Sequence, residues 1–251
     1  MEQRKREDGT VIISHRHRFI FIKTAKTAGT TVELYLRQFC GPDDIVSPLH
    51  IDDELLARSA GIIGPQNHES RLKAPWHLRR RDIPWVRDHH RYPVVNRFYN
   101  HMPATLIRDE IGDEIWTTYT KFTIVRDPWD RVVSNYYWRN RKSRNERHPL
   151  EESVERAGNN WKLYTIDGRS EIDSFFRFES LQADLEALRD RLGFDGEVNL
   201  LRAKGGIRPQ RSSARELLTE QQVQRIAELA HNEIEMFGYR WDGPEPPDNN
   251  S

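Results

Sequence analysis

The segment FIKTAKTAGTTVE, residues 21–33, joins a buried strand to a helix and decides the fold. Its first residues complete the apolar run RFIFIK, residues 18–23, which is typical of a central parallel strand covered on both faces. After Gly29 the apolar residues recur with helical spacing, at Val32, Tyr35, Leu36 and Phe39. The segment therefore predicts a strand, a loop and a helix in succession.

Two further segments repeat this order of elements. In KFTIVRDPWDRVVSNYYW, residues 121–138, a short strand precedes a helix that Asp127 caps and Pro128 begins. In SFFRFESLQADLEALRDRLG, residues 174–193, a strand leads into a helix whose leucines share one face and which Gly193 ends. Alternating strands and helices predict an α/β fold with a parallel sheet, whose ligand binds beyond the carboxyl ends of the strands.

The domain organisation follows from length and composition. A chain of 251 residues without a shift in composition favours one domain over residues 1–251. Its core is expected at about residues 18–241, and the tail from about residue 243 to residue 251 is expected to be disordered. The last helix is predicted to begin at a capping box of Thr219 and Gln222 and to run to Phe237.

The charge balance and the cysteine content restrict the function. Lysine plus arginine number 39, as do aspartate plus glutamate, so we expect neither nucleic acid nor a membrane as a partner, and an anion site must be local. Cys40 is the only cysteine, which suits a reducing compartment. The charged N-terminus is not followed by an apolar stretch of signal length, so we expect a cytoplasmic protein, whose oligomeric state the sequence does not indicate.

The loop KTAKTAGTT, residues 23–31, has the composition of an anion cradle. Small residues between a strand and a helix expose backbone N–H groups, and the helix dipole adds partial positive charge there. The loop contributes Lys26, the hydroxyl groups of Thr27, Thr30 and Thr31, and Gly29, where a larger side chain would block a phosphate. The nucleoside triphosphatase loop requires a lysine directly after its second glycine, which this chain lacks.

A second anion site is predicted at the end of the strand in residues 121–138. The guanidinium of Arg126 is suited to bidentate phosphate contact, and Ser134 is placed off the apolar stripe of the following helix. Two anion sites at strand ends of one sheet predict a ligand with two separated phosphate-like groups.

These motifs resemble those of a known family. FIKTAKTAGTT is similar to the 5′-phosphosulfate motif, and FTIVRDPWDRVVSNYYW to the 3′-phosphate motif, of sulfotransferases that use 3′-phosphoadenylyl sulfate (PAPS). The resemblance extends over residues 19–241, because NHMPATLIRDEIG, FFRFESLQADLEALRDRLG and NEIEMFGYRW also resemble blocks of the branch that contains carbohydrate 2-O-sulfotransferases and bacterial relatives. It implies a three-layer α/β fold related to nucleotide kinases, in which helices flank a central parallel sheet.

The resemblance also implies the residues that bind the donor. The 5′-phosphosulfate is expected at Lys26, Thr27, Ala28, Gly29, Thr30 and Thr31, and the 3′-phosphate at Arg126 and Ser134. A late basic loop is expected to add Arg208, with Lys204 and Arg211 as alternatives. Ala25 departs from the family pattern, since many members carry proline there, but no ligand-contacting group is lost.

The expected reaction is in-line sulfuryl transfer from PAPS, with 3′-phosphoadenosine 5′-phosphate (PAP) as the product. Lys26 would neutralise the departing phosphate, and this scheme needs no metal ion. His101 is the expected general base, because the ordinary pKa of histidine lies near neutrality and its block resembles the family segment that carries the base. His89 and His90 are the alternatives.

The acceptor is expected to bind the irregular segments between the motifs, residues 58–98 and 139–170. A carbohydrate hydroxyl is the first choice, and a small natural product or a peptidyl tyrosine are alternatives. A non-catalytic nucleotide- or nucleic-acid-binding protein is a hypothesis of another class, which the balanced charge disfavours, and a kinase is a third, which the missing lysine motif disfavours.

Overall fold

The structure, a computed structural model, describes residues 11–70, 95–99, 101–141, 147–157, 159–201 and 213–243. Its strands are β1 (Val11–Ser14), β2 (Phe19–Ile22), β3 (Ile45–Val46), β4 (Glu69–Ser70), β5 (Val95–Asn96), β6 (Thr120–Val125), β7 (Thr165–Ile166), β8 (Arg169–Ser170) and β9 (Ser174–Arg177). Its helices are α1 (Gly29–Arg37), α2 (Ile51–Ser59), α4 (Ala104–Ile111), α5 (Asp113–Thr118), α6 (Pro128–Asn140), α7 (Leu150–Ala157), α8 (Trp161–Tyr164), α9 (Leu181–Leu192), α10 (Ala214–Leu217), α11 (Glu220–Leu229) and α12 (His231–Phe237), with a 3₁₀ turn η3 (Phe178–Ser180) before α9. The expected disordered tail lies almost wholly outside these residues.

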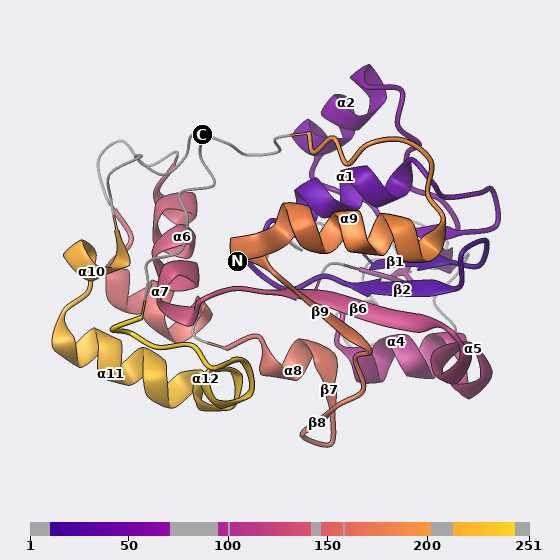
Figure 1. Cartoon of the computed structure of the whole chain (residues 1–251). Coiled ribbons are helices and arrows are strands. Elements are labelled where there is room, and N and C mark those ends of the chain that lie inside the picture. Colours follow the sequence, from indigo (N-terminus) through magenta and orange to yellow (C-terminus); the bar gives the residue numbers. More distant parts are fainter. Residues whose placement is uncertain are drawn as a thin grey trace, which may run out of the picture.

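A five-stranded sheet with the order β3-β1-β2-β6-β9 forms the centre of the fold (Figure 1). β2 pairs with β6 and β6 with β9 in parallel, whereas β1 is antiparallel to both β2 and β3. Four of these five strands therefore run in one direction, and β1 alone runs the opposite way. The predicted α/β fold, with helices flanking a mostly parallel central sheet, is confirmed.

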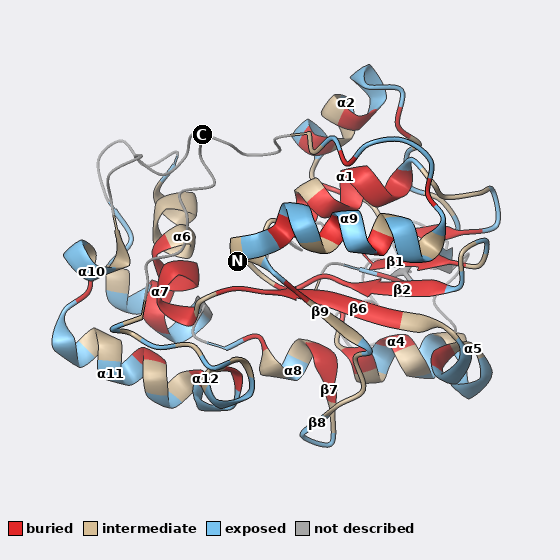
Figure 2. Cartoon of the chain, in the orientation of Figure 1, coloured by how far each residue is buried: buried red, intermediate tan, exposed pale blue. Residues whose placement is uncertain are grey.

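The two faces of the sheet are covered by different helices, which explains the continuous apolar run in β2. Phe19 and Phe21 join the core beneath α1 and α9, whereas Ile20 and Ile22 join the core that α4, α5 and α8 cover. All four side chains are fully buried, and Figure 2 shows the same burial along the central strands. Successive side chains of a strand point to opposite faces, so a strand in the middle layer needs apolar residues at every position.

A separate apolar cluster holds α6 against α7, α10 and α11 beside the sheet (Figure 1). Trp129, Val132 and Val133 are the buried residues that α6 contributes. The predicted Asp127 cap is present, since its carboxylate accepts a hydrogen bond from the Asp130 N–H, and Pro128 occupies the first turn. This packing fixes the direction in which α6 leaves the end of β6.

One element was not predicted, and two differ from the sequence-based expectation. β1, to which the sequence patterns assigned no element, pairs with β2. The predicted last helix starts at its Thr219 capping box but breaks at Ala230, giving α11 and α12. The segment 139–170, expected to be irregular, contains α7, α8 and the β7–β8 hairpin.

Candidate active site

The two predicted anion motifs lie at the ends of neighbouring strands and contact each other. Ile22 of β2 is opposite Thr123 of β6, so the loops that follow these strands leave the sheet at the same edge. The Arg126 guanidinium donates a hydrogen bond to the Lys26 carbonyl oxygen, with an N–O distance of 2.9 Å. The predicted adjacency of the two motifs is therefore present, and the contact joins the residues expected to bind opposite ends of one ligand.

The loop between β2 and α1 has an unusual backbone. Lys26 has φ 64° and Ala28 has φ 61°, so two residues with side chains adopt the left-handed conformation. Such residues cost on the order of 1 kcal/mol or more each, and they persist where the surrounding structure determines them. Ala28 precedes α1 without a side-chain cap, and the first N–H groups of a helix have no intrahelical partner. The loop therefore presents backbone donors and the positive end of α1, as an anion cradle requires.

Asn160 holds this loop from the side. Its carboxamide Oδ1 accepts a hydrogen bond from the Ala25 N–H at 3.3 Å, and its Nδ2 donates to the Ala25 carbonyl at 3.0 Å. Asn160 is buried, and its own backbone N–H donates to Glu233 Oε2 at 3.2 Å. Glu233 also forms a bidentate ion pair with Arg131 of α6, at 2.9 and 2.6 Å. The loop is thus tied to α6 and to the C-terminal helices.

The loop threonines differ in their surroundings. The Thr27 hydroxyl is buried, 2.9 Å from that of Thr24, and donates to the Thr24 carbonyl. Thr30 Oγ1 accepts a hydrogen bond from the Lys23 ammonium at 3.0 Å, and Thr31 is half-buried in the first turn of α1. The Thr27 side chain therefore stabilises the loop through its contacts with Thr24, whereas Thr30 and Thr31 lie at the start of α1.

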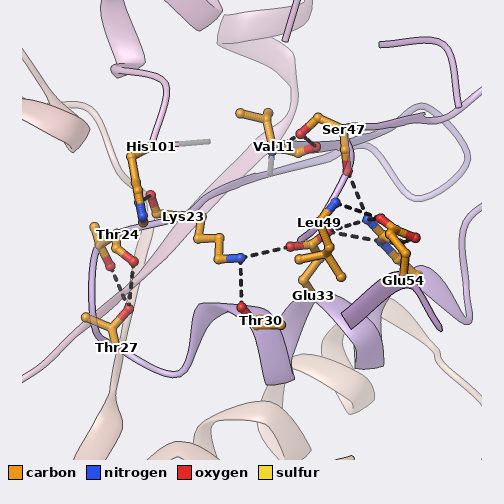
Figure 3. A network of polar contacts seen from close by, with 11 residues as sticks. Val11, Lys23, Thr24, Thr27, Thr30, Glu33, Ser47, Leu49, Glu54 and His101 are labelled. Atoms are coloured by element: carbon orange, nitrogen blue, oxygen red, sulfur yellow. Dashed lines mark hydrogen bonds and ion pairs between the residues drawn. The ribbon is translucent and has the colours of Figure 1, made fainter. Parts of the chain in front are cut away.

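Behind the loop lies a buried network of alternating charges (Figure 3). Lys23 pairs with Glu33 at 3.2 Å, Glu33 with Arg37 at 2.8 Å, and Arg37 with Glu54 at 3.0 Å. Arg37 also donates to the Ser47 carbonyl at 2.9 Å. Two cations and two carboxylates balance in this network, which fixes α1 against the end of β2.

Arg126 and Lys26 each lie against an aromatic ring. The Arg126 guanidinium pairs with Asp130 at 2.6 Å and lies 3.8 Å from the centre of the Phe178 ring. The Lys26 ammonium lies 4.5 Å from the centre of a ring of Trp138 on α6. Each cation is thereby held at the edge of the sheet where the two loops meet.

The carboxyl group of Asp127 is perturbed beside Arg126. Its pKa is raised to about 6, chiefly by burial and also by the neighbouring charges of Asp130 and Glu179, although hydrogen bonds from backbone N–H groups act in the opposite direction. The Asp127 N–H donates to Glu179 Oε1 at 2.8 Å. The carboxylates of Asp127, Asp130 and Glu179 therefore lie close together at the start of α6, and Asp130 contacts the Arg126 guanidinium.

His101 lies at the same strand end as the loop. Its Nδ1 is 3.1 Å from the Lys23 carbonyl oxygen, and the backbone has φ 50° (Figure 3). A carbonyl oxygen only accepts, so this hydrogen bond requires the proton on Nδ1 and, in the neutral ring, leaves the lone pair on Nε2. The structure thus brings His101 to the loop that carries Lys26.

The other predicted site residues are less closely connected. Ser134 is half-buried, about two turns into α6. Arg208, its alternatives Lys204 and Arg211, and the alternative bases His89 and His90 lie outside the described residues. Their roles stay predictions.

Sequence reasoning assigned no role to Lys23 or Asn160, which the structure places against the loop. A lysine directly after a four-residue apolar strand is a usable signal, because burying its charge requires partners. Asn160 has no such signal, since its position in the fold depends on α8 and on Glu233, 73 residues later in the chain.

The comparisons with known proteins identify the class. The sequence matches the Sulfotransferase family over residues 9–169, which is more than half of the chain. The protein therefore belongs to the sulfotransferase family, and sulfuryl transfer is its general chemistry. An uncharacterized protein of Archaeoglobus fulgidus is 28% identical over 109 residues, which are 39% of this chain and 88% of that protein. No solved structure matches the chain.

Within the described part of the chain, no helix is both long and apolar enough to cross a membrane. No group of three or more His, Cys, Asp or Glu residues in the same ranges is placed to hold a metal ion.

Proposed function

We propose that this sulfotransferase moves the sulfuryl group of PAPS to an acceptor hydroxyl, most readily one on a carbohydrate. The observation that carries the proposal is the hydrogen bond from Arg126 to the Lys26 carbonyl oxygen, which joins the two anion motifs. One ligand with phosphate groups at both ends fits such a pair of sites. When bound, PAPS supplies the activated sulfuryl group.

The donor residues are assigned by the chemistry that each position offers. The turn from Lys26 to Thr31 would hold the 5′-phosphosulfate through backbone N–H groups and hydroxyls. Arg126 and Ser134 would hold the 3′-phosphate, with Arg208 as a further contact. Asp130 keeps the Arg126 guanidinium in position, because the carboxylate holds its Nε and Nη2.

Lys26 is proposed to stabilise the negative charge that develops on the departing phosphate. A lysine side chain is flexible, and the contact with Trp138 holds its ammonium beside the cradle. Electrostatic stabilisation by a positioned cation is the main form of catalysis expected for this class of transfer.

His101 is proposed to accept the proton of the attacking hydroxyl at Nε2. The hydrogen bond between Nδ1 and the Lys23 carbonyl supports this role, because it selects the tautomer with a basic Nε2 and fixes the plane of the ring. The carbohydrate acceptor is supported by the sequence blocks that resemble the carbohydrate branch. A small natural product or a peptidyl tyrosine are the alternative acceptors.

The test is incubation with PAPS labelled in the sulfate, together with an extract of host cells, and identification of the labelled product by mass spectrometry. A labelled carbohydrate is expected. His101→Ala should abolish transfer and leave PAP affinity nearly unchanged, with His231→Ala, an exposed histidine of α12, as the control. Lys26→Ala should lower the rate by orders of magnitude, and Arg126→Ala should weaken PAP binding. A wild-type protein that neither binds PAP nor transfers the label would overturn the proposal.

A further inference from the structure

The Lys23 side chain runs behind the proposed phosphosulfate loop. It is 6% exposed, and its ammonium reaches both Thr30 Oγ1 at 3.0 Å and Glu33 Oε2 at 3.2 Å (Figure 3). A Cβ on Gly29 would lie 2.6 Å from Lys23 Cγ and 2.9 Å from Cε, so the side chain fills the space that this glycine leaves. Glycine at position 29 therefore leaves room for the buried Lys23 side chain directly beneath the first turn of α1.

The chemistry of the ammonium group determines the direction of this hydrogen bond. An ammonium has donors and no acceptor, so Thr30 Oγ1 must accept from Lys23. Since Thr30 Oγ1 accepts from Lys23, the Thr30 hydroxyl proton is directed away from Lys23.

We propose that Lys23 is a positioning residue for donor binding: it fixes the Thr30 hydroxyl so that its proton is donated to a 5′-phosphate oxygen of the donor. The inference rests on the proposed function, since it concerns the same cradle. Lys23 itself touches no reacting atom in this scheme. It acts through Thr30.

The charge network supports a role beyond stability. Glu33 is already paired with Arg37 at 2.8 Å, and both side chains are fully buried. Arg37 therefore already provides Glu33 with a counter-charge, although it also pairs with Glu54, and buried ion pairs contribute little net stability compared with apolar residues of similar size. The position of Lys23 is explained by what its ammonium does at Thr30.

The test is a double-mutant cycle on PAP affinity, measured by calorimetry at fixed ionic strength. Thr30→Val should weaken PAP binding about tenfold or more, as expected for a hydrogen bond to a charged group. Lys23→Met should weaken it about tenfold in the wild-type background but less than about threefold in the Thr30→Val background, because the residues act as a unit. Equal losses in the two backgrounds would show a purely electrostatic or structural effect and overturn the inference.

Lys121→Met is the matched control. Lys121 is also 6% exposed, it pairs with Asp173 at 3.0 Å, and it lies near the start of β6, at the opposite end of the sheet. Its loss should lower stability without changing PAP affinity. Should Lys23→Met not fold, Lys23→Met/Glu33→Gln keeps the buried charges balanced and should show the same dependence on Thr30. Absence of PAP binding to the wild type would instead refute the proposed function.

Discussion

Replacing Asn160 should loosen the proposed phosphosulfate loop without changing a residue of the loop. Asn160→Ala removes two hydrogen bonds: the one that the Ala25 N–H donates to Asn160 Oδ1, and the one that Asn160 Nδ2 donates to the Ala25 carbonyl oxygen. Each hydrogen bond contributes about 1 kcal/mol net, so this pair of bonds, the Asn160 clamp, stabilises the ligand-binding conformation of the loop by about 2 kcal/mol. An energy of this size corresponds to roughly a 30-fold change in an equilibrium constant. PAP affinity should therefore fall by up to about 30-fold.

Calorimetry with PAP and steady-state kinetics with PAPS separate the possible outcomes. The KM for PAPS should rise while kcat changes little, because the clamp acts on the loop before the chemical step. Asn159→Ala is the control, since Asn159 is the exposed neighbour and its Oδ1 accepts from the Trp161 N–H rather than from the loop. Asn160→Asp should be at least as severe as Asn160→Ala, because it places a carboxylate oxygen against the Ala25 carbonyl. Wild-type PAP affinity in a folded Asn160→Ala protein would refute the reasoning.

Three further predictions concern stability and the resting position of Lys26. Since burial raises the Asp127 pKa from 3.8 to about 6, the folded state binds this proton more tightly and stability falls as pH rises from about 4 to about 6. Asp127→Asn should remove that pH dependence and raise the free energy of unfolding by about 3 kcal/mol at pH 8, measured by urea denaturation. A wild-type stability that rises relative to the variant between about pH 4 and about pH 6 would contradict this prediction. Gly29→Ala should lower stability by about 1–3 kcal/mol in thermal unfolding, because the added Cβ would clash with the buried Lys23 side chain. Gly64→Ala, whose Cβ would have no atom within 4 Å, should have little effect, and equal melting temperatures of the two variants would count against the close contact between Gly29 and Lys23. PAP binding should change tryptophan fluorescence as the Lys26 ammonium turns from the neighbouring Trp138 ring towards the phosphate, and Trp138→Phe should remove that component; an identical change in the variant would show that the signal comes from another tryptophan and would contradict this movement.

Local patterns were sufficient to predict most of the elements near the site. The apolar run of β2, the Asp127 cap of α6 and the Gly193 end of α9 depend on residues close in sequence, and the structure confirms each of them. The placement of the two anion motifs at one edge of the sheet followed from the rule that parallel strands place their carboxyl ends at one edge, whereas the strand order was not predicted.

The failures concern interactions between distant parts of the chain. Nothing in the helical spacing of α6 predicts a buried position for Arg131, yet it is fully buried, since Glu233, 102 residues later in the chain, compensates its charge. The break between α11 and α12 at Ala230 likewise has no glycine or proline to predict it. Both the ion pair and the helix break depend on tertiary packing, which the spacing of apolar residues within one segment does not indicate.

The ion pair between Arg131 and Glu233 has a consequence for the smallest version of the chain that can fold. The family match ends at residue 169, so Glu233 lies outside it. A recombinant fragment trimmed to the matched region would leave a cation with no counter-charge in the interior, at a cost of about 3–5 kcal/mol, a large part of the stability of a typical domain. The C-terminal helices therefore belong to the same cooperative unit as the proposed donor site, and shortened versions of this enzyme should retain them.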